Sequence, residues 1–146
     1  SDLNVHQLRA RIEQAFAGSG RAPVHVTVMS FGYKYGVPPD ADMLGDCRFL
    51  PNPHWITDLR DATGQDESVA DYVLGQDGAA AYLDHFAAAL RLALDGYARE
   101  GKRYATVALG CTGGKHRSVA MAEALARRVR SGDAEVRVVH RDLGRE

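Results

Sequence analysis

The sequence predicts an α/β domain, in which helices flank a mostly parallel sheet. Three observations support this fold class. The 146 residues suit one domain, apolar strand-like segments alternate with helical patterns, and polar turns follow the strands. Because ligands bind outside the carboxyl ends of strands in such sheets, we expect a ligand pocket at that edge.

The strand predictions rest on apolar runs rich in β-branched residues. Residues 24–31 read VHVTVMSF, in which valines alternate with polar residues before the run becomes apolar. We expect a short second strand at 46–50, a buried third strand at 104–110 and a last strand at 135–141. The first and third should be parallel, side by side or one apart. The intervening PNPHW, at 51–55, contains two prolines and predicts a fixed loop.

Helices are predicted where apolar residues recur at helical spacing. Residues 1–20 are predicted as a linker helix that enters the domain. Its apolar residues at helical spacing begin after Asn4, a residue type suited to N-capping. The alanine-rich residues 77–100 carry large apolar side chains at steps of four, which predicts a long helix. A further helix should begin directly after the third strand, at 118–129.

The turn between the third strand and this helix concentrates polar chemistry. In LGCTGGKHRSV, residues 109–119, the small side chains of Thr112, Gly113 and Gly114 allow backbone amides to converge on an anion. The helix N-terminus adds roughly half a positive charge, and Arg117 offers a planar fork that matches phosphate oxygens. The turn therefore predicts a phosphate site. The alternative is a tight turn whose charged side chains face water.

A second polar group follows the first two strands, and it could complete a sugar-phosphate site. Lys34 adds positive charge, Asp46 and Asn52 can bind hydroxyls, and His54 can donate to phosphate or act as acid or base. Alternatively, His54 is a turn histidine bonded to local backbone. The predicted ligand-binding residues are Lys34, Asp46, Asn52, His54, Cys111, Thr112, Gly113, Gly114, Lys115, His116, Arg117 and Ser118.

Cys111 raises an enzymatic alternative. A cysteine followed after five residues by arginine and serine has the spacing of the cysteine-dependent phosphatase loop, in which the thiolate attacks phosphorus. Against catalysis, Gly110 replaces the histidine of those enzymes, and no tryptophan-proline-aspartate acid loop is present. We expect a non-enzymatic domain, in which Cys111 is catalytic only if the phosphatase alternative holds. The cysteines and histidines lack the paired spacings of a structural zinc site, so no metal is expected.

The charge pattern leaves RNA binding as another alternative. The net charge is −1, but basic residues cluster near the C-terminus. The candidate RNA contacts are Arg127, Arg128, Arg130, Arg137 and Arg141. They could equally lie on solvated helix faces. No apolar run is long enough to cross a bilayer and no signal pattern is present, so we expect a cytoplasmic protein with reduced cysteines and no membrane partner.

Five segments resemble the C-terminal domain of the bacterial RapZ family. They are SFGYKYGVPPDAD, DCRFLPNPHW, LRDATGQDESVADYVL, GCTGGKHRSV and HRDL. The resemblance implies that residues 21–146 form this domain and that a P-loop kinase-like N-terminal domain is absent from the chain. ATP or GTP binding and hydrolysis would belong to that absent domain, and no cofactor is expected here.

The resemblance also implies a function. The domain would sense glucosamine-6-phosphate as a regulatory module, with the turn from Cys111 to Arg117 at the phosphate end and Asp46 and His54 across the pocket. Small RNA, an endoribonuclease and further copies of the chain would be partners. RNA binding is less well supported, because the chain stops at HRDLGRE without the basic tail of RNA-binding members.

Overall fold

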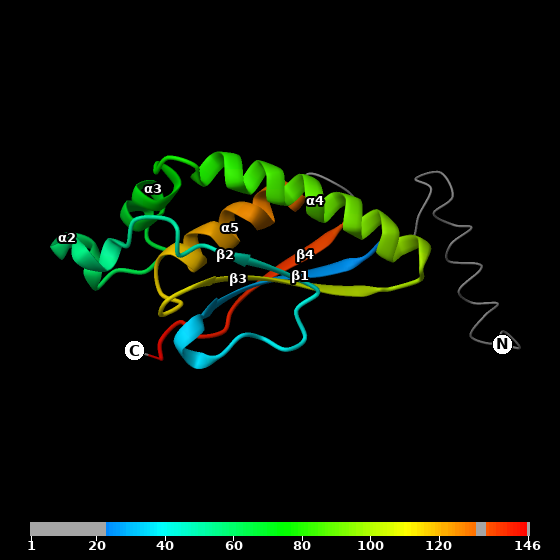
Figure 1. The fold of residues 1–146 in the computed structure, drawn as a ribbon, viewed down its shortest axis with the longest axis horizontal. Coiled ribbons are helices and arrows are strands. Elements are labelled where there is room, and N and C mark those ends of the chain that lie inside the picture. The colour runs from blue at the N-terminus through cyan, green and yellow to red at the C-terminus, as the bar shows by residue number, and fades with distance from the viewer. Residues whose placement is uncertain (1–22, 131–133, 146) are drawn as a thin grey trace, which may run out of the picture.

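The structure of the protein, a computed structural model, describes residues 23–130 and 134–145. The predicted linker helix at 1–20 lies outside these residues. The described chain forms one four-stranded, fully parallel sheet in the order β2-β3-β1-β4 (Figure 1). The strands are β1 (His25–Gly32), β2 (Met43–Asp46), β3 (Tyr104–Cys111) and β4 (Glu135–His140).

The neighbouring positions of β1 and β3 confirm the predicted arrangement of the first and third strands. Gly32 is paired with Cys111, so both strands deliver their next residues to the same edge of the sheet. The predicted second strand at 46–50 was wrong, because β2 ends at Asp46. Residues 48–50 form a turn instead, in which the Leu50 amide donates to the Cys47 carbonyl at 3.3 Å.

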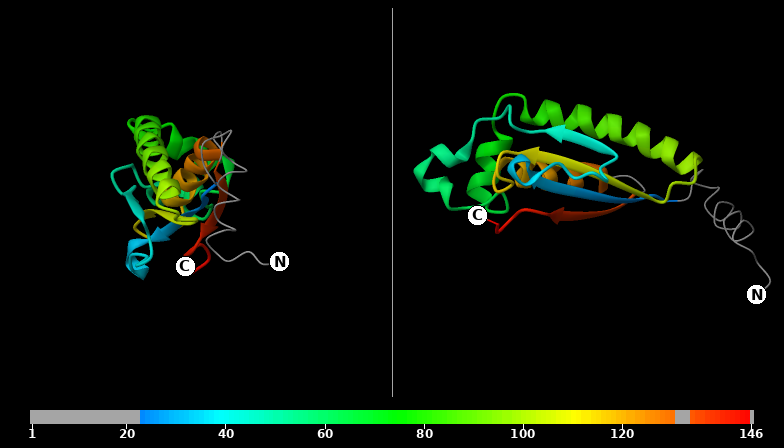
Figure 2. Two further views of the ribbon diagram at one scale, coloured as in Figure 1. Left: turned by 90° about the vertical axis from the view of Figure 1, so that its right-hand side faces the viewer. Right: turned by 60° about the horizontal axis from the view of Figure 1, so that its bottom comes forward.

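The three longer helices lie on one side of the sheet (Figure 2). They are α3 (Glu67–Leu74), α4 (Ala79–Arg99) and α5 (Arg117–Arg130). The structure confirms the two predicted helices, since α4 and α5 agree with the predicted ranges to within two residues at each end. The helix α3 and the short α2 (Thr57–Arg60) were not predicted. Val69 and Val73 of α3 are buried and four residues apart, a helical signal that the short segment carried.

The hydrophobic core lies between the sheet and the helices, and α5 is at its centre. The helix packs on β1, β3 and β4 on one side and against α3 and α4 on the other. Val28, Val107, Met121 and Leu125 are fully buried in this layer. Because α5 is enclosed on both sides, its N-terminus has a fixed position beside the carboxyl ends of β1 and β3.

Short 3₁₀ turns follow β1 and precede α2. The first, η1 (Tyr33–Tyr35), continues β1, and the second, η2 (Pro53–Trp55), lies within the predicted fixed loop. The loop is held by Asn52, whose side-chain oxygen accepts a hydrogen bond from the His54 amide at 3.1 Å. Both turns reach the edge of the sheet where α5 begins.

Candidate functional site

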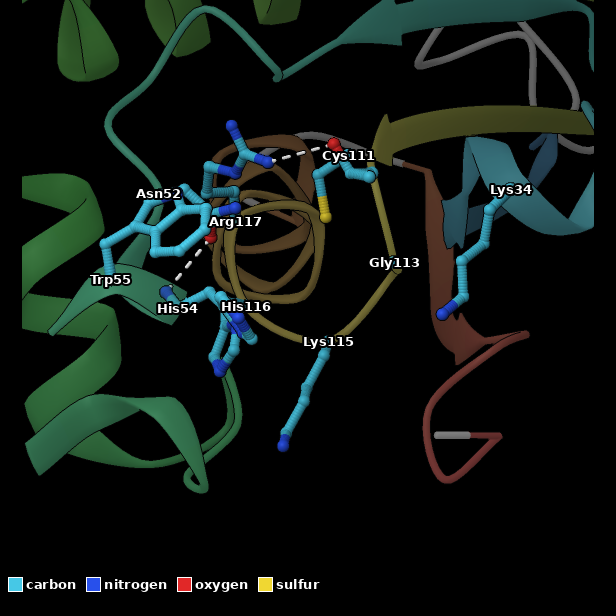
Figure 3. Close-up of a pocket in the computed structure, with 10 residues that line it drawn as sticks. Lys34, Asn52, His54, Trp55, Cys111, Gly113, Lys115, His116 and Arg117 are labelled. Carbon is cyan, nitrogen blue, oxygen red and sulfur yellow. Dashed lines mark hydrogen bonds between the residues drawn. The ribbon is translucent and has the colours of Figure 1, made fainter. Parts of the chain in front are cut away.

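A pocket of about 410 Å³ opens at this edge, within the usual size range of small-molecule sites. It lies beyond the carboxyl end of β3, at the N-terminal end of α5 (Figure 3). The lining residues are Lys34, Asn52, His54, Trp55, Cys111, Thr112, Gly113, Lys115, His116 and Arg117. All except Trp55 were predicted from the sequence, so the structure brings both predicted polar groups to one cavity.

Three predicted residues, Asp46, Gly114 and Ser118, are not among those that line the pocket. Asp46 pairs with the Arg48 guanidinium at 2.8 Å, and the hydrogen bond from Arg48 holds the pKa of this carboxyl below its usual value. Arg48 also lies over the Tyr33 ring, 3.7 Å from its centroid. Asp46 is therefore engaged with Arg48 and does not line the cavity.

Glycines allow the turn after β3 to pack against the end of β1. A Cβ on Gly32 would lie 2.4 Å from the Gly113 carbonyl carbon and 2.8 Å from the Gly114 amide nitrogen. Gly114 has φ of +76°, in the left-handed region that favours glycine, and a Cβ there would lie 2.7 Å from the Gly32 nitrogen. Gly114 thus shapes the turn, whereas Gly113 faces the cavity.

Asp142 fixes this contact from the C-terminal segment. Its buried carboxylate accepts hydrogen bonds from the Gly32 amide at 2.7 Å and from Arg141 at 2.8 and 3.0 Å. Burial by itself raises the pKa of the Asp142 carboxyl. The hydrogen bonds from Arg141 and Gly32 together outweigh this effect, so the pKa lies below its usual value. In the sequence, HRDL contributes only to the family resemblance, and no local pattern around Asp142 indicates this role.

Arg117 is buried, and most of its hydrogen bonds hold the protein together. Nη1 donates to the carbonyl oxygens of Arg48 at 3.1 Å and Leu50 at 3.0 Å, and Nη2 donates to Thr112 Oγ1 at 3.3 Å. Nε is buried without a hydrogen-bond partner in the described structure. The side chain therefore joins the 48–50 turn to the turn after β3, rather than presenting an unoccupied bidentate fork.

The two lining histidines are held differently. His116 is buried, and its Nε2 lies 3.0 Å from the Arg60 carbonyl oxygen, so Nε2 donates this bond and carries a proton. His54 lies on η2, and its ring meets the Trp55 ring edge-on, with centroids 5.0 Å apart. His116 is thus fixed beneath the pocket by α2, while His54 belongs to the more exposed wall.

Cys111 lies at the pocket but directs its thiol toward the protein. The thiol donates to the buried Ser118 hydroxyl, with 3.1 Å between sulfur and oxygen. Cys47 lies beside it, and burial, with a smaller effect of Cys111, raises the pKa of the Cys47 thiol. Both cysteines are free thiols. Within the described parts of the chain, the residues that line the cavity include no aspartate or glutamate. A phosphatase activity stays an untested alternative.

None of the five predicted RNA contacts is among the residues that line the pocket. Arg127 and Arg130 are exposed in the last turn of α5, about 20 Å along this helix from its first residue. The other three arginines bond within the chain: Arg128 to Asp84, Arg137 to Thr27 and Arg141 to Asp142. RNA binding stays a prediction that this geometry does not test.

Comparison with known proteins identifies the family. The family model described as the RapZ C-terminal domain matches residues 24–144. The chain belongs to the RapZ family. This match covers every strand and helix that the structure describes, and the residues that line the pocket.

Relatives of this RapZ-family chain share the similarity over its full length. A nucleotide-binding protein of Frankia alni is 62% identical over the whole chain, which covers 50% of that relative. A nucleotide-binding protein of Mycolicibacterium vanbaalenii is 64% identical, again over the whole chain and 46% of the relative. The chain thus spans about half the length of these RapZ-type relatives, which are named for nucleotide binding.

Within residues 23–130 and 134–145, none of the helices combines the length and apolar character that a membrane span requires. The same part of the chain contains no group of three or more histidine, cysteine, aspartate or glutamate side chains placed to hold a metal ion.

Proposed function

We propose that this domain is a regulatory module whose pocket binds a phosphorylated amino sugar of the glucosamine-6-phosphate type. The observation that carries the proposal is the charge of the lining. Lys34, Lys115 and Arg117 contribute positive charge from different segments, and among the residues that the structure describes no aspartate or glutamate lines the pocket with them. An anionic ligand is the natural complement of such a cavity.

Phosphate fits the end of the pocket at the turn after β3. The N-terminus of α5 adds the positive end of a helix dipole, and the small Thr112 and Gly113 leave the backbone open to an approaching anion. Nε of the buried Arg117 has no hydrogen-bond partner in the described structure. A buried donor without a partner lowers the stability of the folded protein by about 1–3 kcal/mol, which favours a ligand that brings a hydrogen-bond acceptor.

The opposite wall suits the hydroxyl-rich part of a sugar. Asn52, His54 and Thr112 provide amide, imidazole and hydroxyl groups, which can donate to and accept from ligand hydroxyls. The resemblance to RapZ-family domains selects an amino sugar among the sugar phosphates. Membership of the family supports this choice. The names of the relatives refer only to nucleotide binding, which we assign to the half of those proteins that this chain does not cover.

Binding without turnover is the function that the geometry favours. The Cys111 thiol is engaged with the buried Ser118, and Asp46, the one carboxylate among the predicted ligand-binding residues, is paired with Arg48. A bound ligand would contact both the 48–50 turn, through Arg117, and the end of β1, through the glycine turn. Ligand binding would in this way order segments that are distant in the sequence, as a sensor requires.

Calorimetric titration of the purified chain tests the proposal. The panel is glucosamine-6-phosphate, glucose-6-phosphate, glucosamine and inorganic phosphate, and both sugar phosphates should bind more tightly than glucosamine. Arg117→Ala should weaken sugar-phosphate binding by about 1.5–3 kcal/mol, the range for a charge-assisted hydrogen bond. Lys115→Gln should weaken it without releasing the 48–50 turn.

The matched control is Lys102→Gln, since Lys102 pairs with Asp42 outside the pocket lining. This variant should bind as the wild type does. If Arg117→Ala and Lys115→Gln both kept wild-type affinity, the site would lie elsewhere. If glucosamine bound as tightly as its phosphate, an anion site would be the wrong assignment.

A further inference from the structure

Trp55 is the feature of the pocket that phosphate binding leaves unexplained. It is the only tryptophan in the sequence, and it lines the pocket while 76% of it is exposed. Burying an aromatic side chain of this size is favourable, so an exposed indole beside a cavity indicates an uncovered contact surface.

The segment that carries Trp55 is rigid. Its amide donates to the Asn52 carbonyl at 3.2 Å, and the preceding Pro53 is buried. Arg60 Nε donates to the His54 carbonyl at 2.9 Å, which connects the segment to the last residue of α2. The His54 ring supports the indole edge-on. A ligand that contacts this wall therefore loses little binding energy to the ordering of the loop.

The position of the indole relative to the cations suggests which part of a ligand it meets. Figure 3 shows Trp55 and Asn52 on one side of the pocket, with Gly113 and Lys34 on the other. A ligand held by its phosphate at the glycine turn would extend toward the indole. Asn52 and His54 flank that wall with groups that bind hydroxyls, which favours a ring with an apolar face and a polar edge.

We infer that the indole of Trp55 is the surface on which the C–H face of the ligand's sugar ring packs, and that this contact lets the pocket prefer cyclic sugar phosphates over simple phosphates. The inference rests on the proposed function. Trp55 supplies apolar contact area, while Asn52 and His54 bind the hydroxyls at the ring edge. Phosphate binding and ring binding are then carried by different residues and can be separated.

The single tryptophan gives a direct optical test. The probes are glucose-6-phosphate, glycerol-3-phosphate as an open-chain phosphate, uridine monophosphate as a flat-base phosphate, and inorganic phosphate. Glucose-6-phosphate should change the tryptophan emission of the 146-residue chain at saturation. Inorganic phosphate and glycerol-3-phosphate should leave the emission unchanged but, at high concentration, should reverse the change by competition.

Substitutions then assign the contact, with calorimetry as the measurement. Trp55→Ala should lose about tenfold in glucose-6-phosphate affinity, consistent with the removal of one aromatic contact, while inorganic phosphate binds within about twofold of wild type. Trp55→Phe should recover most of the loss. Leu92→Ala is the matched control, because Leu92 is 74% exposed on α4 and does not line the pocket.

The outcomes separate this inference from the proposed function. Sugar-phosphate binding with unchanged emission and unchanged affinity in Trp55→Ala would overturn the inference and leave the proposed function intact. An equal loss for inorganic phosphate would overturn it as well, because Trp55 would then only support the loop. If uridine monophosphate alone depended on Trp55, the surface would bind a base rather than a sugar. Absence of all phosphate binding would remove both proposals.

Discussion

Replacing Asp142 with asparagine tests whether the C-terminal segment holds the pocket together. The carboxylate of Asp142 is buried, and it accepts hydrogen bonds from the Gly32 amide and the Arg141 guanidinium. Asparagine keeps the shape but removes the charge and places an amide donor among these donors. Hydrogen bonds to charged groups contribute about 1.5–3 kcal/mol and neutral ones about 0.5–1.5 kcal/mol. With two main donors affected, Asp142→Asn should lower the free energy of unfolding by about 2–3 kcal/mol.

Urea unfolding at pH 7 measures this loss, and thermal unfolding should show a melting temperature lower by about 5–10 °C. The control is Asp84→Asn, which breaks the exposed pair between Asp84 and Arg128 and should cost less than about 1 kcal/mol. A loss for Asp142→Asn no larger than that of the control would refute the anchoring role of this carboxylate.

The pH dependence gives an independent check on Asp142. Its pKa in the folded protein lies below the ordinary value of an aspartate, because Arg141 and the Gly32 amide donate to the carboxylate, so the folded state favours the charged form. Stability from this group is therefore complete above the unfolded pKa of about 3.9 and is lost as the pH falls through the folded pKa. The stability difference between wild type and Asp142→Asn should be constant near pH 7 and should decrease below about pH 4.

Two further predictions concern the glycine turn and the regulatory role. Gly32→Ala would place a Cβ 2.4 Å from backbone of Gly113, so it should displace the turn, reducing sugar-phosphate affinity at least about tenfold in calorimetry. The control Gly96→Ala, on α4, should be neutral or stabilising by up to about 1 kcal/mol, and equal behaviour of both variants would contradict the packing argument. In a full-length relative, nucleotide should change sugar-phosphate affinity by roughly 5- to 150-fold, with a reciprocal effect on nucleotide affinity. Identical affinities with and without nucleotide would leave a binding module that does not communicate with the other half.

Local patterns in the sequence were sufficient to predict the alternation of strands and helices. The valines of β1, the four-residue spacing along α4 and the glycine-rich turn after β3 each specify their structure over short distances. They were also sufficient to place the lining residues from Cys111 to Arg117 beyond a parallel strand. In such a sheet the carboxyl ends of the strands share one edge, so strand direction alone brings the following turns together.

Particular side-chain partners could not be predicted in this way. Arg117 is the residue type for a phosphate fork, yet the tertiary structure directs Nη1 to two carbonyl oxygens 67 and 69 residues away. Asp46 was expected in the pocket, but its carboxylate accepts a hydrogen bond from Arg48. Arg48 lies only two residues further along the chain, in the turn that follows β2. A polar side chain forms hydrogen bonds with the groups that the tertiary structure places near it. Buried polar groups are nearly always hydrogen-bonded, so these partners depend on the fold and not on the local sequence.

The sequence by itself determined the residue types at the strand ends, and therefore the preference of this edge for an anion. Only the tertiary structure decided that β1 lies between β3 and β4, which brings Asp142 to the Gly32 amide across 110 residues of sequence. It also decided that Trp55 lines the pocket while largely exposed. Strand order and side-chain exposure depend on contacts between segments far apart in the chain, and no local pattern of residues encodes such contacts.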